Sequence, residues 1–440
     1  MTSNELDDGN RMESTATSVR EPRVPAIPRS RDPAALWRHS DFMKLWLAQT
    51  ISVFGDQFTG LAIPLIAALM LQATPGQMGV LTAVERAPFL LIGLFAGVWV
   101  DRLPRRPILV AGDFGRAAVL LTIPLAALLG GLGMPHLYAV GVLVGVFTVF
   151  FDVAYQAFLP ALVGRQQLVE GNSKLEATRS LANLAGPSVA GVVIQALSAP
   201  IAIILDALSF VISGGLISRI RGREPVAGGA RAPVTAEVRE GLRVVFGNRL
   251  LRSIAGCTGT SNFFGSALFA LYILFMTRTL GLTPAKIGAI FSLGNVAGLL
   301  GALSAGRLAA RFGVGRIIVG AAALDGLGLI PIALATRATA FPFLVLAGLL
   351  TSFANPVYNI NQVSLRQAIT PSRLQGRMNA TMRFLVWGTM PLGGLAGGIL
   401  GEALGLRPAI AVSVVGGLLA FLWVALSPVR ALKAIPDPTE

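Results

Sequence analysis

The sequence predicts an all-α integral membrane protein in which twelve transmembrane helices form two pseudo-symmetric six-helix halves. Three observations lead to this fold class. The 440 residues are 54% hydrophobic and only 13% charged, with a mean hydropathy of +0.69, whereas soluble domains carry about 25% charged residues. Apolar stretches near or above the roughly 20 residues that span a bilayer recur along the chain. Arginine-rich loops alternate with loops that hold little basic charge.

The apolar stretches define the expected spans, several of which contain Gly or Pro, as membrane helices tolerate. Their ranges are 42–71, 77–100, 108–130, 137–162, 176–197, 201–219, 253–280, 286–309, 315–335, 340–365, 379–402 and 408–427. Residues 1–35 are polar and proline-dotted and lack the apolar region of a signal peptide, so we expect a disordered cytoplasmic tail. The halves are then 36–219 and 253–429, and residues 430–440 form a second cytoplasmic tail.

The longest loop between expected spans, residues 220–252, divides them six and six. It begins with glycine and proline, as linkers do. After Thr235, a residue type that caps helices, apolar residues recur at helical spacing among arginines over 238–246. This predicts a short amphipathic helix at the cytoplasmic surface. The alternative is an early start of the seventh span.

Basic residues in short loops mark the cytoplasmic side of a membrane protein. One set of loops carries most of them: Arg102, Arg105, Arg106, Arg165, Lys174, Arg219, Arg221, Arg223, Arg307, Arg311, Arg316, Arg373 and Arg377. The opposite set offers Arg278, Lys286, Arg337 and Arg407. Both termini are therefore expected in the cytoplasm.

Several functional classes find no support in the residues. The net charge of +14 lies in short loops between apolar spans, where orientation and anionic lipid explain it better than nucleic acid does. The single cysteine, Cys257, and two histidines, His39 and His136, argue against a disulfide or a metal site. A Walker-type phosphate loop and enzyme constellations are missing, so we expect no enzyme activity and no cofactor, and an ion gradient as the energy source.

The segment that closes the second span reads Gly97-Val-Trp-Val-Asp-Arg-Leu-Pro-Arg-Arg106. It resembles the loop 2–3 signature of the major facilitator superfamily, with Pro104 in place of a usual glycine. The resemblance implies a cytoplasmic latch in which Asp101 faces the N-terminus of helix eleven, where the helix dipole favours a carboxylate. The residues of this latch are Gly97, Asp101, Arg102, Arg105 and Arg106. A charged hairpin that only fixes topology is the simpler alternative.

An internal repeat supports two related halves. Arg179 and Pro187 recur at equal separation as Arg383 and Pro391, and a degraded copy of the latch segment follows the eighth span with Ala310 in place of the acid. Such repeats are characteristic of secondary transporters. The resemblance to the superfamily therefore covers residues 40–430.

The fifth span resembles the antiporter signature of the superfamily around Gly186, Pro187 and Gly191. The resemblance implies export in exchange for protons. Ordinary tight packing of small residues is the alternative.

Ionisable residues within spans are costly and therefore point to function. Asp56, near the centre of the first span, is the first candidate for a proton carrier, and a permanently hydrogen-bonded structural acid is its alternative. Glu85 and Asp152 are further proton-coupling candidates, although Glu85 and its neighbour Arg86 could equally form an ion pair that stabilises the outward end of the second span. Acids in the peripheral spans, Asp206 and Asp325, are expected to be structural.

Polar stripes on the fourth and tenth spans, which line the central cavity in this superfamily, indicate substrate contacts, although helix–helix hydrogen bonding would give the same pattern. The cavity candidates are Gln57, Tyr155, Gln156, Asn262, Asn355, Tyr358, Asn359, Gln362 and Arg383.

The segments Leu45–Gln57 and Leu374–Arg383 look like those of one bacterial branch, the transmembrane secretion effectors, related to macrolide and enterobactin exporters. The resemblance implies a monomeric, multi-pass protein of the bacterial inner membrane that exports drugs, siderophores or secondary metabolites by alternating access. Its partners would be the lipid bilayer, a small-molecule substrate and protons. A proton-coupled importer of a metabolite or lipid-type substrate, and a non-transporting sensor or scaffold, are the alternatives.

Overall fold

A computed structural model describes residues 36–100, 103–163, 167–221 and 234–434. At 94, 95, 97, 98, 234–238 and 372 it describes the backbone alone. The predicted tails at 1–35 and 435–440 and the latch residues Asp101 and Arg102 lie outside these residues. Contacts separate residues 1–35 from Leu36–Glu440, and every helix below belongs to the second unit.

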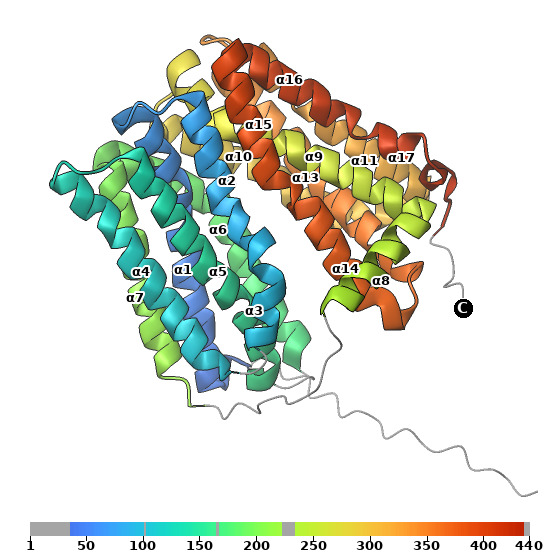
Figure 1. The fold of residues 1–440 in the computed structure, drawn as a ribbon, viewed down its shortest axis with the longest axis horizontal. Helices are drawn as coiled ribbons and strands as arrows, with labels where there is room; N and C mark the ends of the chain where they lie inside the picture. Colours follow the sequence, from blue (N-terminus) through green and yellow to red (C-terminus); the bar gives the residue numbers. More distant parts are fainter. Residues whose placement is uncertain (1–35, 101–102, 164–166, 222–233, 435–440) are drawn as a thin grey trace, which may run out of the picture. The chain divides into compact units, whose positions relative to one another are not determined.

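The N-terminal half consists of helices that Figure 1 colours from blue to green. They are α1 (Ser40–Leu65), continued by a π-helical turn (Ile66–Met70), α2 (Pro75–Leu91), α3 (Gly93–Val100), α4 (Arg105–Leu128), α5 (Met134–Val163), α6 (Leu168–Ala196) and α7 (Ala199–Ser218). Within this half α1 packs on α6 and α7, and α5 packs on α2 and α4.

The C-terminal half follows in yellow to red (Figure 1). Its helices are α8 (Val234–Gly247), α9 (Arg249–Leu274), continued by a π-helical turn (Phe275–Thr279), α10 (Pro284–Phe312), α11 (Val314–Gly328), α12 (Ile330–Leu334), α13 (Ala340–Ala368), α14 (Ser372–Trp387), α15 (Thr389–Leu404), α16 (Leu406–Leu419) and α17 (Leu422–Ala425). Here α13 packs on α10 and α11, and α9 packs on α15 and α16.

The all-helical membrane architecture is confirmed. Among the described residues, 10 helical stretches are long and apolar enough to cross a bilayer. The other two expected spans are α2–α3, which is interrupted at Ile92, and α6, whose first half contains several charged side chains. The count of twelve is thus supported in part. Helices α6 and α14 begin at Leu168 and Ser372, before the expected 176 and 379, because their first turns are polar and apolar runs do not mark them.

Helices α2 and α10 begin with the same local sequence, although only α2 has a side-chain cap. Each follows a π-helical turn, and each has a threonine immediately before a proline in the first helical turn. Thr74 and Gln77 form a reciprocal capping box: the Thr74 hydroxyl accepts from the Gln77 N–H at 3.3 Å, and the Gln77 side chain accepts from the Thr74 N–H at 2.9 Å. Thr283 occupies the equivalent position before Pro284. This repeat of local structure adds to the sequence repeat of the two halves.

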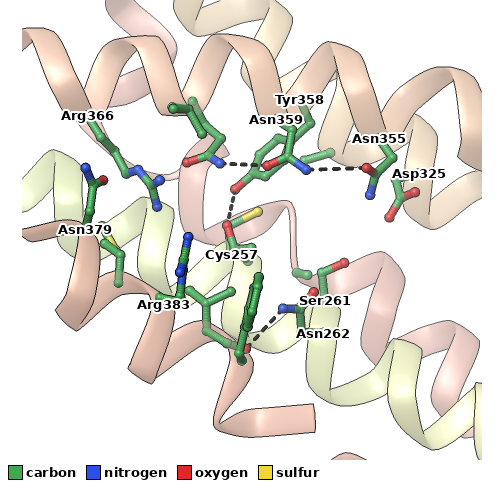
Figure 2. A pocket seen from close by; sticks show the side chains of 18 of the residues that line it. Cys257, Ser261, Asn262, Asp325, Asn355, Tyr358, Asn359, Arg366, Asn379 and Arg383 are labelled. Atoms are coloured by element: carbon green, nitrogen blue, oxygen red, sulfur yellow. Dashed lines mark hydrogen bonds between the residues drawn. The ribbon is translucent and has the colours of Figure 1, made fainter. Parts of the chain in front are cut away.

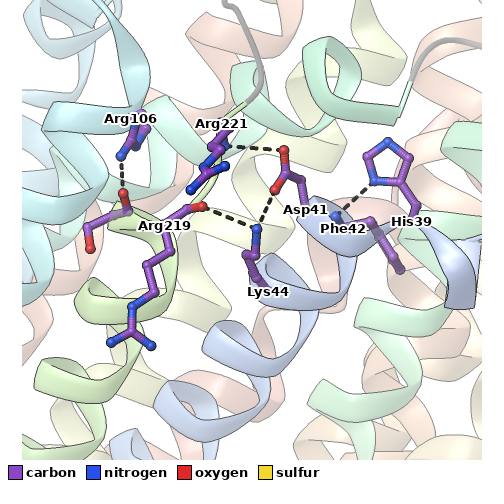
Figure 3. Close-up of polar contacts among 8 residues, drawn as sticks. His39, Asp41, Phe42, Lys44, Arg106, Arg219 and Arg221 are labelled. Carbon is purple, nitrogen blue, oxygen red and sulfur yellow. Dashed lines mark hydrogen bonds and ion pairs between the residues drawn. The ribbon is translucent and has the colours of Figure 1, made fainter.

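The two ends of the helix assembly differ. We name the end where α1, α4, α6 and α14 begin the linker end, because α7 ends and α8 begins there, and the opposite end the far end. At the linker end, contacts join segments of one half. Figure 3 shows Lys44, which pairs with Asp41 at 2.7 Å and donates to the Arg219 carbonyl at 3.2 Å. Arg106 donates to the Ser218 carbonyl in the same region.

Glycine backbones join the halves toward the far end, along two pairs of helices. Gly79 of α2 faces the backbone of Gly394 and Gly398 on α15. Gly288 of α10 faces the Pro187 carbonyl and Gly191 on α6. A Cβ atom at Gly79 or Gly288 would collide with the facing backbone, so these glycines allow the helices to approach closely. We call the two contacts the glycine seams.

Hydrogen bonds between the halves occur at the same end. The Gly76 N–H donates to Glu402 Oε2 at 2.9 Å, and Arg278 Nη2 donates to the Ala68 carbonyl at 3.1 Å. These charge-assisted bonds hold the far end together beyond the packing of the seams.

The amphipathic helix predicted in the linker is present as α8 and packs on α14. Val245 is fully buried in a cluster with Met378 and Met382. Glu240 pairs with Arg377 across the same contact. The helix therefore buries part of its apolar face against protein.

A buried ion pair ties α4 to its neighbours inside the N-terminal half. Arg116 Nη2 lies 2.5 Å from Asp113 Oδ1, and both side chains are at most 5% exposed. The guanidinium packs over the rings of Phe151 and Phe210, with its Cζ 4.4 and 4.1 Å from their centroids. Ser213 donates to the other carboxylate oxygen at 2.6 Å. Both charges are thus partnered, as burial requires.

The glycine seams make a stability prediction. Gly288→Ala places a methyl group against the Pro187 carbonyl, and overpacking of this kind costs about 1–3 kcal/mol. Gly306→Ala, on the same helix with open space around it, should be neutral or stabilising because alanine favours helix more than glycine does. Unfolding in detergent measures both. Equal effects of the two variants would contradict the seam.

The ion pair makes a second prediction. Arg116→Met leaves Asp113 buried without its cation, so the free energy of unfolding should fall by about 3–5 kcal/mol. Lys44→Met, which removes the cation of the partly exposed pair with Asp41, should cost less than about 1 kcal/mol. The same detergent unfolding experiment compares them, and a similar loss in both variants would refute the assigned role of Arg116.

Candidate functional site

A polar cavity of about 590 Å³ lies among α9, α11, α13 and α14 (Figure 2). We call it the C-half cavity. Its polar lining residues are Thr258, Ser261, Asn262, Asp325, Asn355, Tyr358, Asn359, Gln362, Arg366, Asn379 and Arg383. Because α13 places residues three and four positions apart on one face, its polar stripe projects into one space.

The stripe on α13 forms a chain of hydrogen bonds. Gln362 Nε2 donates to Asn359 Oδ1 at 2.9 Å, and Asn359 Nδ2 donates to Asn355 Oδ1 at 3.4 Å. The hydroxyl groups of Tyr358 and Thr258 are 2.8 Å apart and link α13 to α9. These bonds, drawn in Figure 2, fix the orientation of the amides before anything binds.

Two polar atoms of the lining have no hydrogen-bond partner. Gln362 is 2% exposed, and its Oε1 is buried and unpaired. Arg366 Nε, one turn further along α13, is also buried and unpaired. Figure 2 shows the Arg366 side chain on the side of the cavity where Asn379 and Arg383 of α14 lie. One acceptor and one donor are therefore left for a polar group that enters the cavity, since buried polar groups are normally hydrogen-bonded.

A second hollow, of about 430 Å³, lies between the two halves. Asp152 and Gln156 of α5 line it from one half, and Asn379, Arg383 and Trp387 of α14 line it from the other. Arg383 stacks over Trp387 with its Cζ 5.2 Å from the ring centroid. Arg383 also lines the C-half cavity, so the two spaces share a wall.

A third hollow is bounded by α6 on one side and by α10 and α13 on the other. Asn295 Nδ2 donates to the Asn183 carbonyl across it at 2.8 Å, and Gln57 Nε2 reaches Asn183 Oδ1 at 3.3 Å. It shares Asp325 and Asn355 with the C-half cavity. The third hollow, which lies between the halves, thus adjoins the C-half cavity.

The structure brings two of the three proton-coupling candidates together. Asp56 is exposed, and its charged neighbours are Arg116 and Asp113 of α4, Asp152 of α5 and Arg179 of α6. Glu85 lies elsewhere, against Gly141 of α5 and beside Arg86. Asp56 and Asp152 therefore belong to one site, to which Glu85 does not contribute.

Most of the residues predicted to contact substrate line the hollows. Three of the predicted residues also contact other protein groups. Asn262 donates to the Val386 carbonyl at 3.0 Å, which connects α9 to α14. Tyr155 stacks on Phe151 with a centroid distance of 6.2 Å. Gln57 packs against Gly186 of α6 as well as reaching Asn183. Tyr155 and Gln57 are the two candidates that none of the described hollows includes among its lining residues.

The antiporter-like residues act in packing in this conformation. Gly186 leaves room for Gln57, and Pro187 and Gly191 form one glycine seam with α10. The predicted latch falls only partly within the described residues. Gly97 belongs to α3, Arg105 is 8% exposed at the start of α4, and the latch as a whole remains a prediction.

Sequence reasoning missed several residues of the site. Arg366 follows Gln362 at a spacing of four, so extending the polar stripe of α13 by one turn would have found it. Asp325 lies in a span expected to be peripheral, yet it lines two hollows. Asp206, also expected to be structural, is fully buried beside Asp56. The sequence gives no signal for the last two beyond their being acids within spans.

The chain matches the family model described as transmembrane secretion effector over residues 32–438. A multidrug efflux pump, Tap, of Mycolicibacterium fortuitum is 29% identical over 80% of this chain and 87% of that protein. The enterobactin exporter EntS of Salmonella typhi is 25% identical over 78% of this chain and 81% of that protein.

Solved structures agree on the fold. The crystal structure of a bacterial homologue of the iron transporter ferroportin, in its inward-facing state, superposes with a TM-score of 0.71 at 18% identity, over 88% of this chain and 98% of that one. With the family model covering nearly the whole chain, the protein belongs to the transmembrane secretion effectors, a family of multi-pass membrane transporters within the major facilitator superfamily.

Proposed function

We propose that this transporter exports amphiphilic small molecules, such as drugs, siderophores or secondary metabolites, in exchange for protons. The observation that carries the proposal is the C-half cavity, in which Gln362 Oε1 and Arg366 Nε are buried without partners. A substrate that supplies the missing acceptor and donor would be favoured, because leaving such groups unpaired costs about 1–3 kcal/mol each. The similarity to the Tap efflux pump and to EntS supports export over uptake.

The lining of the cavity favours a particular class of substrate. Amides and hydroxyl groups alternate with the apolar side chains of Met382, Trp387 and Met390. The charged groups are the guanidinium groups of Arg366 and Arg383 and the carboxyl of Asp325. Bulky molecules that are neutral or weakly anionic, with both aromatic and polar faces, suit this surface best.

The arrangement of the halves supports alternating access. The glycine seams and the hydrogen bonds of Gly76 and Arg278 close the far end. The hollow between the halves is lined as far as Gly376 and Asn379, in the first turns of α14 at the linker end. We propose that the linker end faces the cytoplasm of a bacterial cell, with both chain termini on that side, as the arginine distribution predicts. The cavity would then receive substrate from inside.

Proton exchange at Asp56 would supply the energy. Asp56 is exposed, and Asp152 nearby faces Arg383 of the other half across the hollow between the halves. A change in the charge of these acids alters the attraction between the halves, which couples protonation to the conformational equilibrium.

Export can be tested with ethidium, erythromycin and a catecholate siderophore in a bacterial strain that lacks its main efflux pumps. Expression of the protein should lower the accumulation of at least one of them. Asp56→Asn should restore accumulation to the level of the empty vector. Arg366→Met should weaken export about tenfold or more, because hydrogen bonds to charged groups contribute about 1.5–3 kcal/mol. Arg373→Met, an exposed arginine on α14, is the matched control and should export normally.

The direction of coupling is measured in proteoliposomes that contain a pH indicator. External addition of an exported compound should make the lumen more alkaline, because protons leave as substrate enters. Acidification of the lumen would indicate co-transport of substrate and proton, and would favour an importer. Export that is unaffected by Asp56→Asn would remove this residue from the mechanism, and unchanged accumulation of all three compounds would argue against efflux of this substrate class.

A further inference from the structure

We propose that Asp56 on α1 and Asp206 on α7 form a carboxyl pair that shares one proton, and that this pair is the proton-binding site of the transporter. The inference deepens the proposed function and rests on proton coupling in the N-terminal half. It assigns a direct role to Asp206, an acid in a span that the sequence places at the periphery.

A glycine places the Asp206 carboxyl against the backbone of α1, one residue before Asp56. Gly55 precedes Asp56, and a Cβ atom at Gly55 would collide with the side chains of Asp206 and Ser209. Helix α7 therefore lies against α1 at this point, with Asp206 facing the backbone next to Asp56. The two acids are electrostatic neighbours in this arrangement.

Asp206 lacks the hydrogen bonds that a buried carboxylate requires. Its side chain is 0% exposed, and Oδ1 accepts from the Ser209 hydroxyl at 3.1 Å. Oδ2 is buried and has no hydrogen-bond partner within normal geometry, although the Thr59 hydroxyl lies beside the carboxyl group. A proton on Oδ2 explains the unpaired atom, because a protonated carboxyl becomes a donor and can bond a neighbouring carboxylate.

The surrounding charges do not neutralise the pair. Arg116 of α4 is the nearest cation, but it is committed to Asp113 at 2.5 Å and held between two aromatic rings. The other charged groups that face Asp56 are Asp152 of α5 and Arg179 of α6, one of each sign.

Asp152 also faces Arg383, so four acids (Asp56, Asp113, Asp152 and Asp206) stand against three arginines, and one negative charge is left over. Two adjacent carboxyl groups in apolar surroundings resist ionising together, so they keep one proton between them.

The two acids differ in access, which gives each a separate task. Asp56 is exposed, whereas Asp206 is fully buried. A proton therefore enters and leaves through Asp56, and Asp206 holds it in the closed interior. The proton passes from water to a carboxylate oxygen of Asp56 and from there to a carboxylate oxygen of Asp206. It returns to water by the same path.

Infrared spectroscopy of the purified, full-length protein tests the pair without a substrate. Protonated carboxyl groups have a C=O stretching band that carboxylates lack. At neutral pH, Asp56→Asn and Asp206→Asn should each lose the intensity of one protonated carboxyl, because the remaining acid has no second negative charge beside it. The double variant should lose the same amount and no more.

Asp325→Asn is the matched control, since it removes an acid that lines the cavity of the other half. Its effect on the band should add to that of Asp56→Asn, as expected for independent sites. Full intensity in Asp206→Asn would overturn the pair and leave Asp56 to act alone. Twice the single loss in the double variant would overturn the shared proton.

A milder variant covers the case in which Asp206→Asn does not fold. Ser209→Ala removes the hydroxyl that donates to Asp206 Oδ1 and keeps both acids. It should shift the frequency of the band if Asp206 shares the proton, and an unchanged frequency would refute this. This outcome is independent of the export assay. If the pair shares a proton but the protein does not export in exchange for protons, the proposed function is refuted and the pair is not.

Discussion

The structure depends on close contact between glycine backbones of the two halves. At one seam Gly79 of α2 meets α15, and at the other Gly288 of α10 meets Pro187 and Gly191 of α6. Small residues allow helix backbones to approach within van der Waals contact where larger side chains would hold them apart. Because both seams lie toward the far end, the halves are joined there, and polar spaces remain between them toward the linker end. A contact made of backbone atoms, with few side chains interlocked, can separate without repacking a core.

The two halves contribute different polar groups to the interior of the molecule. The N-terminal half contributes acids, with Asp56, Asp113, Asp152 and Asp206 gathered around Arg116. The C-terminal half contributes amides, hydroxyl groups and guanidinium groups in a cavity of about 590 Å³. We therefore propose that proton handling and substrate recognition belong to separate bundles, which meet where Asp152 and Arg383 line the same hollow. In this proposal, proton binding and substrate binding are coupled through the contact between the two halves.

Much of this organisation is readable from the sequence. Apolar runs, arginine-rich loops and the repeated Arg–Pro spacing predict the helical halves, and helical periodicity finds the stripe that ends in Gln362. The places of Arg366 and Asp325 in the cavity are not predicted, because they depend on which helices face the same space. The start of α6 is not predicted either, because its first turns are polar and lack an apolar pattern. The proposed pairing of Asp206 with Asp56 depends on the packing of α7 on α1, which spacing along the chain cannot reveal.

The central claim is that the halves pivot between a closed far end and a closed linker end. Spin labels on Gln195 and Lys286 report the far end, and labels on Ser173 and Arg373 report the linker end, each pair in a Cys257→Ala background. The distance within each pair is measured by double electron–electron resonance at neutral and at acidic pH. The account predicts that the two distances change in opposite directions. Distances that stay fixed, or that lengthen together, would contradict it.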